Sequence, residues 1–141
     1  MAERTSTTVS YSAGQAKTVT VSAAKTVTVG ESGTTFILDA AVGYAVTLPA
    51  IADGLVYDFV VGSAFDTSDW VISSSEGDNI NGILVVNGAS VPAAGEDNVT
   101  FELAAESVGD WVRFVADAGN SQWIVTGIAN SAASLSANDP A

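Results

Sequence analysis

Carboxylates are the most numerous side chains in this sequence that could do chemistry. The 141 residues include 16 Asp and Glu, only four Lys and Arg, and no His or Cys. Without His and Cys, most general-base, nucleophilic and zinc chemistry lacks its usual residues. The remaining possibilities are carboxylate-based: calcium binding and glycoside hydrolysis.

Three segments with loop composition gather these carboxylates: 66–69 (DTSD), 76–79 (EGDN) and 96–98 (EDN). Calcium needs six to eight oxygen ligands, but none of the segments has the spacing of a twelve-residue calcium loop. Nothing singles out a carboxylate pair for glycoside hydrolysis. We therefore predict a solvated acidic surface, no catalytic residues, no metal, no cofactor and no enzymatic activity. A calcium-dependent or carboxylate-based hydrolase is the alternative from another class.

The three tryptophans are the other candidates for ligand contact. Trp70, Trp111 and Trp123 could stack on sugars. Each lies in or beside an alternating apolar segment, where a large aromatic side chain usually packs in a core. We predict core or subunit-interface packing for all three.

The net charge of −12 is unevenly distributed. Residues 1–30 hold three cations and one carboxylate, a net of +2, whereas residues 31–141 hold Arg113 and fifteen carboxylates, a net of −14. A strongly acidic body disfavours nucleic acid and anionic membranes as partners. The sequence has no secretory signal and no apolar run near the ~20 residues that span a bilayer, so we expect a soluble protein made in a cytoplasm.

The hydrophobic pattern predicts an all-β protein of about ten short strands at spacings of roughly 8–12 residues. Such a pattern is typical of an antiparallel β-sandwich or a jelly-roll-like barrel. We expect a body over residues 31–128 and a flexible C-terminal tail over 129–141, which is rich in Ala, Ser and Asn.

The last third of the body predicts a hairpin with a four-residue loop at 106–109. In that register, Phe101 faces Phe114 on one side, and Glu102 opposes Arg113 on the other. A final strand is expected at 122–128.

Residues 1–30 predict an extended N-terminal arm. The hexamer AKTVTV occurs twice, at 16–21 and 24–29, and alternates Thr with Val as half-buried strands do. These segments are either ordinary strands of the domain's own sheet or a ribbon that adds to the sheet edge of a partner. On the second interpretation the candidate partner-binding residues are Lys17, Thr18, Val19, Val21, Lys25, Val27 and Val29.

The body also carries recognisable segments: TTFILDAAVGYAVTLPA, LVYDFVV, INGILVVNGASV and VGDWVRFVADAGNSQWIVTG. Over roughly residues 34–128 they resemble the head decoration, or capsid cement, proteins of tailed bacteriophages. The closing segment 109–123 also resembles phage fibre and other virion proteins. The resemblance implies a β-sandwich-like, oligomeric body on the outer surface of a capsid, with no catalytic residues.

We therefore expect a structural virion protein that bridges neighbouring major capsid subunits from outside. The expected partners are the major capsid protein and further copies of the chain, a trimer being favoured over a dimer. Residues 1–30 are expected to dock, so deleting them should remove capsid binding and leave the body folded. The alternative is a tail-fibre or host-adhesion module that binds glycans.

Overall fold

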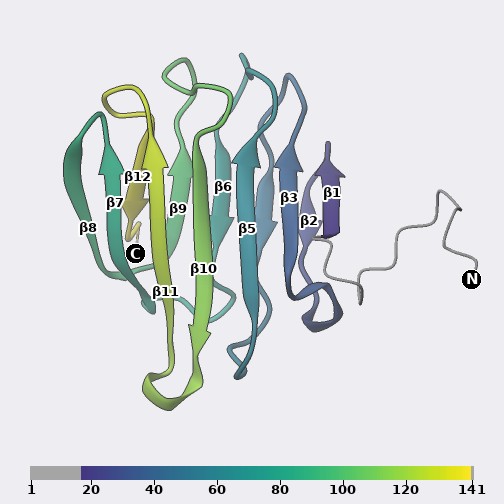
Figure 1. The fold of residues 1–141 in the computed structure, drawn as a ribbon, viewed down its shortest axis with the longest axis vertical. Coiled ribbons are helices and arrows are strands. Elements are labelled where there is room, and N and C mark those ends of the chain that lie inside the picture. The colour runs from purple at the N-terminus through teal and green to yellow at the C-terminus, as the bar shows by residue number, and fades with distance from the viewer. Residues whose placement is uncertain (1–16, 141) are drawn as a thin grey trace, which may run out of the picture.

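The computed structural model describes residues 17–140, which form two β-sheets packed face to face as a sandwich (Figure 1). Sheet A has seven strands in the order β1-β3-β5-β10-β11-β7-β8, and sheet B has five in the order β12-β9-β6-β4-β2. The strands are β1 (Lys17–Val21), β2 (Lys25–Thr26), β3 (Thr34–Leu38), β4 (Ala45–Thr47), β5 (Val56–Val61), β6 (Trp70–Ser73), β7 (Ile80–Val86), β8 (Ala89–Glu96), β9 (Asn98–Phe101), β10 (Trp111–Asp117), β11 (Gln122–Ala129) and β12 (Leu135–Asn138). No helix in this part of the chain is long and apolar enough to span a bilayer.

The first six strands wind as a flattened coil. Successive strands alternate between the sheets, so that β1, β3 and β5 are parallel neighbours in sheet A and β2, β4 and β6 in sheet B. Each crossing to the opposite sheet reverses the chain, and two crossings restore its direction. The predicted antiparallel arrangement is therefore wrong for this half, although the predicted sandwich is confirmed.

The two AKTVTV copies lie in one turn of this coil. The first copy forms β1 in sheet A, and the second begins with β2 in sheet B. The two copies are thus separate strands of the domain's own sheets, which was one of the two interpretations. The arm predicted over 1–30 is not a separate unit in its described part, because residues 17–30 belong to the sandwich; residues 1–16 lie outside the described residues.

The second half of the chain forms antiparallel hairpins. The turn at Asn87 and Gly88, both with positive φ, joins β7 to β8. A 3-10 turn, η3 (Ala118–Asn120), joins β10 to β11. The antiparallel pair β10–β5 connects these hairpins to the coil, and the parallel pair β11–β7 joins the two hairpins to each other. In sheet B, β9 pairs antiparallel with β6 and with β12, so both sheets are mixed.

The hairpin predicted around 106–109 does not form. Phe101 ends β9 in sheet B, where β9 pairs with β6 and β12, whereas Phe114 lies on β10 in sheet A. Both phenylalanines are fully buried because both sheets direct side chains into the same core. Alternation therefore identified the inward-facing residues correctly, but the predicted strand pairing is wrong. The predicted pair of Glu102 with Arg113 is also absent, because Glu102 accepts a hydrogen bond from Ser136 and Arg113 donates to Asp58.

The predicted flexible tail also contains a strand. β12 pairs antiparallel with β9 along its whole length, and Leu135 at its start is 2% exposed. The prediction of a flexible tail relied on the many small polar residues of this segment and gave no weight to Leu135, the one large apolar side chain that anchors it.

Aromatic side chains dominate the core between the sheets. On sheet A, Phe36 stacks on Phe59 at 5.2 Å between ring centroids, and Phe59 meets Phe114 edge to face at 5.9 Å. Trp123 continues the cluster, and Trp70 fills the core from sheet B. The predicted core packing is thus confirmed for two of the three tryptophans.

Candidate interaction surfaces

The first coil leaves two strand edges unpaired among the described residues. β1 ends sheet A and β2 ends sheet B, and both lie at the same side of the sandwich (Figure 1). The Val21 carbonyl accepts the Asp39 N–H, so Val21 directs its backbone groups toward β3. Backbone direction alternates along a strand, and the N–H and C=O groups of Thr18 and Thr20 therefore point toward the free edge.

The same reasoning applies to β2. Val27 donates its N–H to the Thr47 carbonyl at 2.8 Å, which places the backbone groups of Thr26 on the outer side. The threonines of the repeat thus occupy the edge positions of both strands, and Thr18, Thr20 and Thr26 also have exposed side chains.

The structure separates the seven predicted partner-binding residues into two groups. Val21 and Val27 are buried in the core, Val19 packs against it, and their side chains are not available to a partner. Thr18 is exposed, and Val29 is 56% exposed in the 3-10 turn η2 (Val29–Glu31).

The two lysines among the seven predicted partner-binding residues differ in their surroundings. Lys25 is half-buried, forms a 2.9 Å ion pair with Glu31 and lies over the Phe36 ring at 5.5 Å from its centroid. Desolvation alone would raise the pKa of Glu31, but hydrogen bonds from Lys25 and Thr28 outweigh it and lower that pKa. Lys25 is therefore a structural cation. Lys17, also half-buried, has no ion-pair partner within 17–140.

Sheet A presents a broad apolar surface to the outside, which we call the apolar face. Side chains at neighbouring register positions form rows that run across the strands. One row is Ile37, Val60, Trp111, Ile128 and Val85, and a parallel row contains Val56, Val115 and Ile124. Ile83 on β7 adds to it. Several of these side chains are substantially exposed: Ile83 55%, Ile128 52%, Ile124 39% and Trp111 36%.

One ion pair lies between these rows. Arg113 on β10 donates from Nε and Nη2 to the two carboxylate oxygens of Asp58 on β5, at 2.7 and 3.0 Å. These hydrogen bonds and the neighbouring negative charge raise the pKa of Arg113. Because the pair is bidentate and its charges cancel, the apolar face carries no net charge at its centre.

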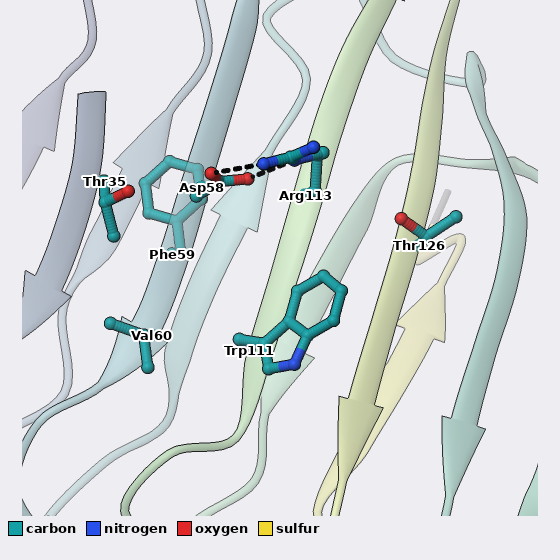
Figure 2. Close-up of a pocket in the computed structure, with 7 residues that line it drawn as sticks. All are labelled: Thr35, Asp58, Phe59, Val60, Trp111, Arg113 and Thr126. Atoms are coloured by element: carbon teal, nitrogen blue, oxygen red, sulfur yellow. Dashed lines mark hydrogen bonds and ion pairs between the residues drawn. The ribbon is translucent and has the colours of Figure 1, made fainter. Parts of the chain in front are cut away.

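A hollow of about 460 Å³ opens on this face beside the ion pair. Figure 2 shows the hollow between β3, β5, β10 and β11, with Trp111 on one side of it and the joined Asp58 and Arg113 above. Val60 lines it across from Trp111, and hydroxyl groups of Thr35 and Thr126 border it. The hollow reaches β11, where Thr126 lies between Ile124 and Ile128; we call the exposed isoleucines of β11 and β7 the ridge.

The outer surface of sheet B is chemically different. Its outward positions are mostly small or polar: Thr26, Ala45, Thr47, Val71, Ser73, Asn98, Thr100, Ser136 and Asn138. Several of these bond to one another, as when Asn138 donates to Ser136 at 3.0 Å and Thr100 donates to Asn98 at 3.0 Å. The two sides of the sandwich therefore offer a partner very different surfaces.

Most carboxylates of the predicted acidic loops satisfy backbone groups. Asp69 accepts the N–H of Leu103 at 2.7 Å, and Glu76 accepts that of Ile51 at 3.0 Å. The buried Asp110 accepts two N–H groups, from Ser107 and Asn130. These side chains fix loops, a role that sequence reasoning missed because three of the four donors, Leu103, Ile51 and Asn130, are 20 or more residues away in sequence.

Two of the acidic loops meet at one site. Asp78 and Asp97 lie together with Asp139, with one carboxylate oxygen of each within 4.8 Å of the others. A hydrogen bond that the protonated Asp78 carboxyl donates to Asp97, together with repulsion from Asp97 and Asp139, raises the pKa of Asp78. Asp78 is exposed, so this cluster remains a surface feature without a ligand assigned to it.

The apolar face was the feature least visible in the sequence. The predicted core or interface packing of the tryptophans points to it only at Trp111, and the sequence pattern does not say on which side of the sheet the isoleucines of β11 and β7 lie. Their alternation with the buried Val125 and Leu84 was the available signal.

Comparison of the chain with protein-family models, curated proteins and solved structures gave no match.

Proposed function

We propose that this chain is a non-enzymatic structural protein of a tailed-phage virion, which binds the outer capsid surface and bridges neighbouring major capsid subunits. The resemblance of residues 34–128 to capsid decoration proteins motivates the proposal. The observation that carries it is that β1 and β2, at one side of the sandwich, are edge strands with no further strand partner within residues 17–140. A partner strand can add to either edge through backbone hydrogen bonds.

The edges suit this docking mode in their chemistry. The outward backbone groups belong to threonines, which have high strand propensity and no charge. Each backbone hydrogen bond contributes only about 0.5–1.5 kcal/mol, so one edge alone binds weakly. Several copies in one oligomer turn such weak contacts into tight attachment to a repetitive shell. The net charge of −12 also suits a position outside the shell, away from packaged DNA.

The test changes the edge without changing the core. Thr20→Pro removes an N–H that points away from β3, and proline is tolerated at such an edge position. Thr20→Val is the matched control because it keeps this N–H. Both are mixed with capsids assembled from the major capsid protein of the same phage, and bound protein is measured by co-sedimentation.

We expect Thr20→Pro to weaken binding about five- to tenfold per site, in line with one lost hydrogen bond, and Thr20→Val to bind normally. Equal binding of both variants, with equal melting temperatures, would exclude docking through β1. A truncation lacking residues 1–16 reports separately on that segment and leaves β1 intact.

The second candidate function is a fibre or host-adhesion module. The hollow favours it, because Trp111 lies beside the Asp58–Arg113 pair and could stack on a sugar ring. Copy number in purified virions separates the two functions: a cement protein is present in hundreds of copies, a fibre in tens. Glycan-array binding that is lost in Trp111→Ala would support the adhesion module.

A further inference from the structure

We propose that the apolar face of sheet A packs against the same face of another copy of this chain. This surface is distinct from the β1 and β2 edges, and the inference does not depend on the proposed capsid role. Its first support is composition: large apolar side chains cover five adjacent strands, from β3 to β7, whereas the outer surface of sheet B is small and polar. Exposed apolar patches of this extent on soluble domains mark interaction sites.

Charge identifies the occupant as another copy. With a net charge of −12, the chain would attract a basic partner through an acidic surface. The apolar face is instead neutral, and its only ion pair sets a negative group on β5 beside a positive group on β10. A copy facing this surface can place its Arg113 near Asp58 and its Asp58 near Arg113. Self-complementarity of this kind is what a symmetric interface requires.

The shape of the apolar face also favours another copy of the chain as its partner. The hollow extends from β3 across β5 and β10 to Thr126 on β11, and the most exposed isoleucines, Ile128 and Ile83, belong to β11 and β7 at the other end of the same face. When two such faces meet, the ridge of one copy enters the hollow of the other.

The available area fits a weak, concentration-dependent contact. The five strands from β3 to β7, about 4.8 Å apart and with outward rows spread over five residues of about 3.4 Å, cover about 24 Å by 17 Å. This is about 410 Å² per copy and about 820 Å² for a pair, within the range of weak and transient interfaces.

Sedimentation velocity of the full chain over a range of concentrations tests the inference. The native protein should sediment at a multiple of the 14.2 kDa chain mass. Ile128→Glu places like charges in the interface and should weaken association at least about 100-fold. Ala45→Glu is the matched control, an exposed small residue on the outer surface of sheet B, and should associate as the native chain does. Ile83→Glu replaces Ile128→Glu if that variant melts below the native protein.

Fluorescence supplies an independent readout. Trp70 and Trp123 are fully buried, so acrylamide quenching reports on Trp111. Quenching should be low in concentrated native protein and should increase on dilution and in Ile128→Glu. A native chain that is monomeric at all concentrations would overturn the inference, as would loss of association in Ala45→Glu but not in Ile128→Glu. Thr20→Pro should leave the mass unchanged, so failure here is distinguishable from failure of the capsid proposal.

Discussion

Truncation at the N-terminus distinguishes an arm from an integral part of the sandwich. Deleting residues 1–16 leaves every described strand in place, whereas deleting residues 1–30 removes β1 and β2. The longer deletion also removes Val21 and Val27, which are 4% and 1% exposed. The original expectation that the body stays folded without residues 1–30 therefore needs correction.

The structure sets the size of the effect. Burying a valine side chain contributes about 1.5–3 kcal/mol, so the two buried valines account for about 3–6 kcal/mol. The deletion also exposes Phe36 and Leu38 on β3, which β1 now flanks, and removes the Lys25–Glu31 ion pair. Domains of this size have a free energy of unfolding of about 5–15 kcal/mol, so the deletion removes much or all of it.

Chemical denaturation followed by circular dichroism measures these differences. We expect the chain lacking residues 1–16 to unfold at nearly the native denaturant concentration, and the chain lacking residues 1–30 to be unfolded or to unfold at a far lower one. Val27→Ala is the point-mutation counterpart and should cost about 1.6 kcal/mol from two lost methyl groups, plus the cost of the cavity. A chain without residues 1–30 that unfolds as the native one does would refute the placement of β1 and β2 in the sandwich.

Three further outcomes are expected. Asp78→Asn should raise the melting temperature at neutral pH. Because the pKa of Asp78 is raised in the folded protein, ionisation of this side chain destabilises the fold as pH rises through the carboxyl range. The increase in melting temperature should therefore vanish in acid, where Asp78 is protonated. Asn also suits the positive φ of 48° at this position, and an unchanged melting temperature at neutral pH would contradict the repulsion. Gly82→Ala should strongly lower the denaturation midpoint, because a Cβ there would collide with the Val125 carbonyl and φ is 152°; Gly54→Ala, where nothing lies within 4 Å, should cost only the strain of its positive φ. Self-association should strengthen between about 20 and 200 mM salt, since screening reduces repulsion between copies of charge −12, and weakening with salt would indicate ionic contacts instead.

The sequence alone determined the chemical character of this protein and the inward side of most strands. Alternation of apolar and polar residues indicated an all-β sandwich and placed Phe101 and Phe114 on the apolar side of their strands, which the structure buries in the core. The period of two depends only on backbone geometry, so it survives any choice of strand partner.

Only the tertiary structure decided which strands are neighbours. The same alternating segments fit the predicted hairpin of Phe101 with Phe114 and the observed arrangement on opposite sheets. Pairing depends on the crossings between sheets, and these are fixed by contacts far apart in sequence, such as the Asp69 carboxylate on the Leu103 N–H. The apolar face arises in the same way, because its side chains come from five strands that parallel and antiparallel pairing bring into register.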